Sequence, residues 1–455
     1  MTKPAPAATT GSADPAPDAP AGTLAAAGWR QQARAEVRAW LGVNSMPTRH
    51  DEAWKYTPLK RLEEHDAEQQ ADPVAAPDRG VIDELAGSHG SVRLVFVNGR
   101  FSAAASDVAA EPSSGVVVGA LSTLAADGSP AARSVEQQVA ARRSSRFDGY
   151  QALNTLYSPD AAVVWLAEGA TLEGPVHIVH LSLPGSAPSA SHPLTFVCAA
   201  PRSTLQVVET YAGLPGFGLV NARTSLAVSS GANVTYERVQ SEAADTVHVG
   251  HTGAVLARDA NLRTSSLQLG GDLARAALDV VLAGEGAHAD LSGLYLPDGV
   301  QHLDNVVTVD HAASRTTSRQ LYKGVIDDAG HGCFTGHVIV QAGTAAVDAA
   351  QTNRSLLLSR TAQTDTRPWL EILADDVRCS HGATVGRLDE ESLFYLRARG
   401  IPEATARAVL VGAFAGEVLD TIAVESLRNQ LAHEIAAAGH IPLEVHGEVD
   451  REVGE

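Results

Sequence analysis

The sequence predicts a mainly β protein whose core is a parallel β-helix or solenoid, with helical regions on either side of it. From about residue 160 the chain consists of short runs rich in Val, Leu and Thr, broken by Gly, Asp, Asn and Ser, which is the composition of strands and turns. Turn-like tetrads also recur at a nearly constant period. A fixed period of this length is typical of stacked repeats that bury a face against their neighbours.

The repeat is visible in the tetrads SGAN at 230–233, RDAN at 258–261, EGAH at 285–288 and QAGT at 341–344. The anchor positions, spaced by 27 to 29 residues, are Ser203, Gly231, Asp259, Gly286, Ser314 and Gly343. An earlier turn at Gly169 lies 34 residues before Ser203, and the loop LPGSAPSASH accommodates the excess. The alternative is a large β-sandwich whose turn spacing is coincidental.

We expect five segments along the chain. Residues 1–22 form a disordered tail, because their Pro, Ala, Ser and Asp content cannot bury enough surface to offset the chain entropy, and they lack the apolar run of a signal peptide. Residues 23–158 form an N-terminal region of helical and mixed structure. The β-helix core covers 159–388, a C-terminal helical domain covers 389–440, and 441–455 form an acidic tail.

Local patterns predict the elements of the N-terminal region. The spacing of apolar residues in GWRQQARAEVRAWLG predicts an amphipathic helix that ends near Gly42. DEAWKYTPLKRL is expected to be structured, and VRLVFVNGRFSAA to form two strands about an Asn98-Gly99 turn. The run VEQQVAARRSSRFDGYQALNTLYS has a helical pattern and closes this region near residue 158.

The pattern returns to helix beyond residue 388. Asp389 is placed to cap a helix over EESLFYLRAR, Gly400 to end it, and Pro402 to occupy the first position of the next helix. Apolar residues then recur every four positions from Leu410 to Ile422, and again over residues 427–435. These apolar stripes either dock on the end of the solenoid as a cap or form part of a partner surface.

The charge and cysteine content exclude several classes of function. The chain has 34 Lys and Arg against 53 Asp and Glu, a net charge of −19, which repels nucleic acid and anionic membrane surfaces. No apolar stretch approaches the length of a membrane span. Three cysteines are an odd number too small for a disulfide framework, which favours a reducing compartment and a cytoplasmic location.

Cys379 and His381 are the strongest candidates for metal-type chemistry. On a strand, residues two apart face the same side, about 6.5 Å apart at roughly 3.3 Å per residue, which suits neighbouring ligands of a multi-atom cluster. A thiolate and an imidazole are ligands for soft or borderline metals, and a cluster that takes four protein ligands would draw the others from a partner or from exogenous thiols. The more frequent origin of such a pair is a buried cysteine and a hydrogen-bonded core histidine. A nucleophile and its base are disfavoured by the geometry.

A second candidate metal site combines His331, Cys333 and His337, again at same-face spacing. The alternative of polar residues on a solenoid face beside a buried thiol is favoured, because no carboxylate or further thiol accompanies them nearby in the sequence. Cys198, in LTFVCAA, is expected in the core. The chain has no GxxxxGK[ST] phosphate loop, CxxC pair or GxSxG elbow. A carbohydrate-active β-helix enzyme is a distant alternative, since the acidic residues are scattered among turns.

Long blocks of the sequence resemble the SufB/SufD family of the Suf iron-sulfur cluster assembly system, and its SufD branch in particular. The resemblance is strongest over SRQLYKGVIDDAGHGCFTGHVIV, AAQTNRSLLLSRTAQTDTRPWLEILADDVRCSHGATVGRLDEESLFYLRARGI and AFAGEVLD. It is looser over DEAWKYTPL, VFVNGRF and ALNTLYSPDA, and so spans roughly residues 50 to 437. The SufB branch has an acidic, EHEAT-like sequence where this chain has CSHGAT. Cys333 and the long N-terminal tail depart from the pattern.

The resemblance implies a right-handed parallel β-helix flanked by helical regions, in a non-catalytic scaffold subunit of a SufBCD complex. The implied partners are a SufB-like paralogue, a SufC-type ABC ATPase and downstream cluster acceptor proteins. An iron-sulfur cluster would be built transiently at the interface with the paralogue, with His381 contributing and Cys379 matching the motif cysteine. The resemblance also implies that reduced FAD is associated with the complex. The ATPase would bind the C-terminal helices, for which we expect contacts from Phe394, Leu410, Phe414 and Val418. A SufB-like paralogue is the alternative within the family.

Overall fold

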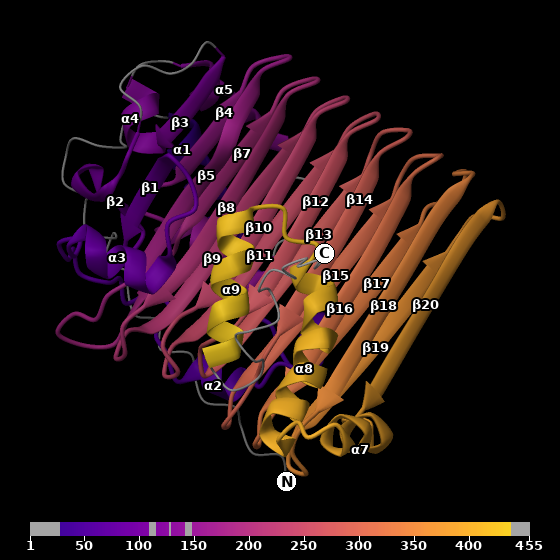
Figure 1. Ribbon diagram of the computed structural model, residues 1–455. Helices are drawn as coiled ribbons and strands as arrows, with labels where there is room; N and C mark the ends of the chain where they lie inside the picture. Colours follow the sequence, from indigo (N-terminus) through magenta and orange to yellow (C-terminus); the bar gives the residue numbers. More distant parts are fainter. Residues whose placement is uncertain (1–27, 109–114, 127–128, 142–147, 438–455) are drawn as a thin grey trace, which may run out of the picture.

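Successive coils of the chain stack into a parallel β-solenoid with two long sheets that face each other (Figure 1). The computed structural model describes residues 28–108, 115–126, 129–141 and 148–437, so the predicted tails at 1–22 and 441–455 lie outside the described residues. From β7 onward the strands alternate between the sheets, and each pairs in parallel with the strand one coil away. The predicted parallel β-helix is therefore confirmed, and the sandwich alternative is wrong.

The strands of the solenoid form two sheets, here called sheet I and sheet II. In hydrogen-bonded order, sheet I contains β2 (Arg100–Phe101), β1 (Val92–Val97), β5 (Thr171–Ser182), β8 (Thr204–Gly213), β10 (Asn233–Ser241), β12 (Asn261–Gln268), β14 (His288–Tyr295), β16 (Thr317–Ile326), β18 (Val347–Leu357) and β20 (Val377–Gly386). Sheet II contains β19 (Gln363–Ile372), β17 (His331–Val340), β15 (His302–His311), β13 (Leu273–Leu282), β11 (Val247–Leu256), β9 (Gly218–Val228), β7 (Leu194–Ala199), β4 (Ala162–Leu166) and β3 (Val116–Ala120), with β6 (Ser189–Ser191) on β9.

The turns between coils lie close to the predicted anchor positions. Positive φ angles, which suit a left-handed turn residue, occur at the predicted anchors Gly169, Gly231, Asp259, Gly286 and Gly343. The other two anchors were each wrong by one residue, because the left-handed residues are Arg202 and Arg315 and not their serine neighbours. An arginine at such a turn gives no turn signal in the sequence.

The interior of the solenoid has an apolar side and a polar side. Leu205, Val234, Leu262 and Ala289 stand in register on four successive coils of sheet I and belong to one buried cluster. Each such apolar side chain contributes about 1 to 3 kcal/mol by leaving water. Further along the same strands the interior is lined by buried polar groups that must find partners inside the protein.

Glu209 on β8 is the centre of one such buried polar network. Its Oε1 accepts hydrogen bonds from His180 Nε2 (3.0 Å) and Thr195 Oγ1 (2.5 Å), and its Oε2 accepts from Thr224 Oγ1 (2.7 Å) and Tyr236 Oη (2.5 Å). Burial opposes ionisation, but these hydrogen bonds outweigh it and lower the pKa of Glu209 to about 2. Both sheets are thus joined across the interior through one carboxylate.

Helices and short segments of the N-terminal region cover the first coils. They are α1 (Gly28–Leu41), η1 (Glu52–Trp54), α2 (Leu59–Glu63), α3 (Arg79–Ala86), η2 (Ala103–Ala105), α4 (Leu121–Ala126), α5 (Pro130–Ala141) and α6 (Gly149–Tyr157). The predicted first helix and the Asn98-Gly99 hairpin are confirmed. The predicted helical run over 135–158 is wrong as one helix, because Asp148 is extended and caps α6 through a bond from the Gln151 amide.

Residues 52–63, here called the N-terminal strap, cross the outer face of sheet II. Trp54 and Leu62 of the strap are buried in one cluster with Leu219, Val249 and Leu273 of the sheet. The segment DEAWKYTPLKRL is therefore structured, as predicted, and its apolar residues determine where it lies on the sheet. It stops water from reaching part of the outer face of the middle coils.

The C-terminal helices α7 (Glu390–Ala398), α8 (Glu403–Leu419) and α9 (Glu425–Ala437) follow the last strand. Asp389 caps α7 by accepting from the amides of Glu391 and Ser392, which confirms the predicted cap. α8 and α9 lie across the outer face of sheet I (Figure 1) and form one buried cluster with residues of β8, β10, β12 and β14. The alternative in which these helices cap the end of the solenoid is therefore wrong, because their apolar residues pack against the outer face of sheet I. No helix among the described residues is long and apolar enough to cross a membrane.

We predict that Glu209→Gln lowers the free energy of unfolding by about 2 kcal/mol at neutral pH, because it removes the charge that four buried donors surround. Since the folded pKa lies below the ordinary value of 4.5, this stabilisation is complete above that pH and disappears as the pH falls toward 2. Urea unfolding of both proteins between pH 7 and pH 3 measures the difference.

The matched control is Glu168→Gln, at an exposed carboxylate whose ion pair with Arg202 lies in solvent. It should change stability by less than about 0.5 kcal/mol. Equal stabilities for Glu209→Gln and the unmodified protein at pH 7 would contradict the role given to this network.

Candidate functional site

The solenoid ends in an open terminal coil formed by β19 and β20. Each of these strands pairs with only one other described strand, so its outer edge has no partner within the described part of the chain. Nearly all residues of both strands are exposed or half-buried, in contrast to the preceding coils. Ile372, Leu373 and Val385 add large apolar side chains that are 41 to 53% exposed. The first coil is different, because the short strand β2 and helices cover it.

Cys379 and His381 both lie on β20, which confirms that one strand carries them on the same face. Cys379 stands in register with Ala349 and packs partly against the buried cluster of the last coils, so its side chain is directed to the solenoid interior. His381 stands over Gln351, which is buried in that interior. His381 itself is exposed. The pair therefore lies at the mouth of the interior, on the face that the open coil leaves accessible.

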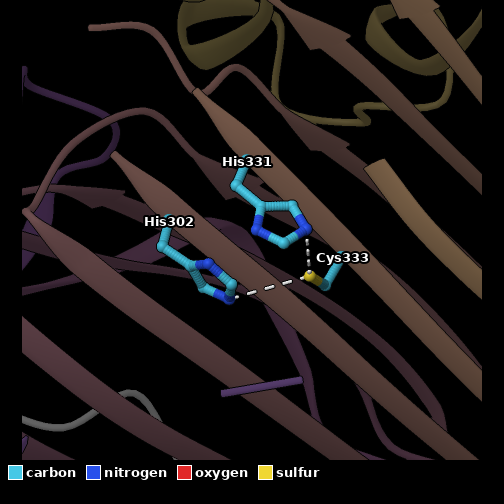
Figure 2. Close-up of side chains that lie close together, drawn as sticks. All are labelled: His302, His331 and Cys333. Carbon is cyan, nitrogen blue, oxygen red and sulfur yellow. Dashed lines mark hydrogen bonds between the residues drawn. The ribbon is translucent and has the colours of Figure 1, made fainter. Parts of the chain in front are cut away.

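A second group of metal-binding side chains lies on the outer face of sheet II. Cys333 Sγ is 3.5 Å from His331 Nε2 on the same strand and 3.6 Å from His302 Nε2 on the neighbouring strand β15. The two imidazole rings stand edge to face, with centroids 4.6 Å apart. Figure 2 shows both rings turned toward the sulfur. The three ligand atoms lie within 4.8 Å of one another.

Carboxylates on the adjacent coils accompany this group. Asp365 on β19 stands in register with Cys333, and its Oδ2 lies 2.8 Å from His331 Nε2. Asp304 on β15 stands in register with Cys333 on the other side and is almost fully buried. Arg275 and Thr57 each donate to Asp304 Oδ2 over 2.6 Å. The expectation that no carboxylate accompanies Cys333 holds only along the sequence, because both aspartates lie about one coil away.

Sequence reasoning missed His302 and grouped His337 with His331 and Cys333. His337 lies on the same strand face but six residues from His331, roughly 20 Å along an extended strand. It stacks on Trp369 and its Nε2 lies 3.2 Å from Glu371 Oε2. His302 precedes His331 by 29 residues, which is one period of the repeat. The period was therefore the signal that could have found it.

Burial controls the protonation of these thiols and imidazoles. Burial, with the charges of Asp304 and Asp365, raises the pKa of Cys333 well above its ordinary value. Burial lowers the pKa of His302 to about 4. Cys198 is buried as predicted, accepts a hydrogen bond from Gln138 Nε2, and has its pKa raised to about 12 by burial. Burial also raises the pKa of the half-buried Cys379.

The chain matches two family models that together cover almost all of the described residues. Residues 182–414 match the SufBD core domain of SUF system FeS cluster assembly, and residues 26–178 match the SufBD protein N-terminal region. The chain belongs to the SufBD family. Both candidate sites fall within the core-domain match.

Two relatives of the SufBD family illustrate the extent of the similarity. The iron-sulfur cluster assembly protein SufD of Escherichia coli is 31% identical over 86% of this chain and 88% of its own length. An iron-sulfur cluster assembly SufBD family protein of Synechocystis is 30% identical over 86% of this chain and 87% of its own length. Membership of this family associates the chain with iron-sulfur cluster assembly.

The four residues expected to bind an ATPase differ in exposure. Phe394 on α7 is 71% exposed, and Tyr395 beside it is 58% exposed. Leu410 and Phe414 on α8 are half-buried. Val418 is fully buried against sheet I, so it offers no surface to a partner in this arrangement and the prediction for it is corrected. Of these four residues of the SufBD-family chain, Phe394 on α7 therefore has the most accessible side chain.

We predict that one thiol of the folded protein reacts readily with Ellman's reagent. Cys198 and Cys333 are buried, whereas Cys379 is partly accessible at the open coil, so Cys379 should react first despite its raised pKa. Cys379→Ser should remove the reaction of the native protein, and all three thiols should react after denaturation. If the folded Cys379→Ser variant still reacted rapidly with the reagent, the burial of Cys198 and Cys333 would be contradicted.

Proposed function

We propose that this chain is a SufD-type scaffold subunit that joins a SufB-like paralogue through its open terminal coil and shares with it the place where an iron-sulfur cluster is built. The observation that carries the proposal is the outer edge of β19 and β20, which no described strand pairs with, together with His381 and Cys379 beside it. In this proposal the chain is a non-catalytic assembly subunit, and the cluster is its cargo.

The open coil supports a partner of similar architecture. A row of unpaired backbone N–H and C=O groups on an edge strand is a template for pairing with another chain, and solenoids need their ends covered. A paralogue with a matching terminal coil would continue both sheets across the interface. The exposed Ile372, Leu373 and Val385 would be buried by the same contact. The pairing and the apolar contact thus favour the same surface.

His381 and Cys379 supply only part of a ligand set. An imidazole and a thiol about 6.5 Å apart suit separate atoms of a cluster, and an assembling cluster needs further ligands that a partner would contribute. Partial ligation suits a subunit that must release its cluster to acceptor proteins. Because His381 is exposed and Cys379 is half-buried with a raised pKa, we assign the larger role to His381.

For the ATPase, we infer that α7 forms the accessible part of its docking surface. Phe394 and Tyr395 are exposed aromatic residues on a helix that immediately follows the terminal coil. Aromatic side chains are frequent anchors at protein interfaces. ATP hydrolysis by a SufC-type partner would then act on the helices that pack against sheet I.

Two alternatives lead to different outcomes. If the chain were SufB-like, Cys379 and not His381 would be the principal ligand of the assembly site. Membership of the SufBD family leaves the carbohydrate-active alternative without support. The reduced FAD implied by the resemblance stays a prediction, because it is not tied to particular residues of this chain.

We predict that His381→Ala lowers cluster formation by the complex about tenfold or more, because it removes one ligand of the growing cluster. The assay is anaerobic reconstitution with iron and sulfide, followed by absorbance of the cluster in the visible range. His381 is exposed, so folding and association with the paralogue should be unchanged in gel filtration.

The matched control for this experiment is His288→Ala, at a half-exposed histidine on β14 that is paired with Asp290 and lies three strands from β20 in sheet I. It should leave cluster formation unchanged. Unimpaired assembly by His381→Ala would exclude the ligand role, and a larger loss with Cys379→Ala would favour the SufB-like alternative.

We predict that Phe394→Ala weakens binding of the ATPase subunit about tenfold or more, as expected for an exposed aromatic anchor. Isothermal titration of the purified ATPase into the purified chain measures it. Val300→Ala, at an apolar residue that is 67% exposed in the turn between β14 and β15, should bind as the unmodified chain does. Equal affinities for both variants would place the ATPase elsewhere.

A further inference from the structure

We propose that His302, His331 and Cys333 form a binding site for one divalent transition-metal ion of the zinc type, with Asp365 as the fourth ligand. The site is separate from the Cys379 and His381 pair, although Asp365 belongs to β19 of the terminal coil. Cys333 alternates with Phe334, which lies in the interior cluster, so Cys333 is directed to the outer face of sheet II. Cys379 packs against the interior cluster instead.

The distances between the ligand atoms match those of a tetrahedral ion. Zinc takes sulfur at about 2.3 Å and histidine nitrogen at about 2.0 to 2.1 Å, so a tetrahedral angle places the two ligand atoms about 3.6 Å apart. The Sγ to Nε2 distances from Cys333 are 3.5 Å to His331 and 3.6 Å to His302. Both rings also present Nε2 to the sulfur (Figure 2). A metal ion would therefore enter without large movement of these groups.

The backbone holds these ligands rigidly. β15 and β17 are internal strands of sheet II, with a paired strand on both sides of each. His302 and His331 are direct register partners, and Cys333 follows two residues later on the same face. Since strand spacing and rise are fixed, the three side chains converge without a flexible loop. Such preorganisation favours a metal site over an incidental contact of polar groups.

Asp304 provides a second, independent indication of a cation. Its Oδ2 is bound by Arg275 and Thr57, but its Oδ1 is buried and has no hydrogen-bond partner among the described residues. Asp304 is two residues from His302 on the same strand face and in register with Cys333. A buried carboxylate oxygen without a partner costs free energy, which a nearby cation offsets. The single positive charge of Arg275 can neutralise only one of the acidic groups gathered here.

The fourth ligand and the access route come from the exposed side of the site. Asp365 Oδ2 already lies 2.8 Å from His331 Nε2, and the Asp365 side chain is 42% exposed. The His331 side chain is 27% exposed, so an ion can reach the site from solvent past these two residues. One thiolate, two imidazoles and a carboxylate select a borderline or soft ion, not Mg²⁺ or Ca²⁺.

The test uses Co²⁺ as a spectroscopic probe on the purified full chain under reducing conditions. We expect one Co²⁺ per chain, with a thiolate-to-cobalt charge-transfer band and the visible absorption of tetrahedral cobalt, both removed by competing Zn²⁺. Cys333→Ser should abolish the charge-transfer band, whereas Cys198→Ser and Cys379→Ser should retain it. Asp304→Asn should keep the band but lower the affinity about tenfold, as for a supporting carboxylate. A parallel anaerobic titration with Fe²⁺ tells whether iron is also accepted.

Far-ultraviolet circular dichroism checks that each variant is folded. His331→Gln provides a second test at a partly exposed position, and it should also remove the tetrahedral spectrum. Absence of the charge-transfer band in the unmodified chain, or a band that persists in both Cys333→Ser and His331→Gln, would overturn the proposal.

Discussion

Parallel backbone pairing between successive coils is the constraint on which the rest of this structure depends. Each strand from β8 to β18 is hydrogen-bonded to the strand one coil before and one coil after it, and in sheet I the register continues without a slip from β8 to β18. Residues about 28 positions apart are therefore neighbours, and each strand position becomes a row along the solenoid. The apolar rows hold the core together, and the polar rows place groups such as Glu209 where only internal partners can satisfy them.

The same constraint explains where chemistry is possible. Inside the solenoid, rows are closed by the opposite sheet, and a functional group becomes accessible only where the stack ends, as at Cys379 and His381. On the outer faces, a row is free only where no helix or strap covers it. The group around Cys333 lies at the edge of the N-terminal strap, whose Thr57 contacts Asp304. The position of each site is thus determined by where neither the opposite sheet, a helix nor the strap covers a row of side chains.

Coverage of the outer faces also divides the C-terminal helices into two parts. α8 and α9 bury their apolar residues, Val418 included, against sheet I, and Lys323 of β16 forms an ion pair with Glu417 of α8. α7 keeps Phe394 and Tyr395 exposed. In the sequence, the apolar residues of a helix that packs on the sheet look the same as those of a helix that stays exposed. The surface on which a helix packs, and not its apolar pattern, determines which of its residues stay accessible to a partner.

The sequence by itself determined the repeat, five of the seven turn positions, the Asp389 cap of α7 and the common face of Cys379 and His381. These features depend on residues close together in the chain, where helical and strand periods act directly. Only the tertiary structure decided which coils bring Asp304 and Asp365 to Cys333 and His302 to His331. Turns such as those at Arg202 and Arg315 shift the period by one residue, and in a strand that shift moves a side chain to the opposite face. Neighbours one coil apart therefore become known only when the register of every strand is fixed.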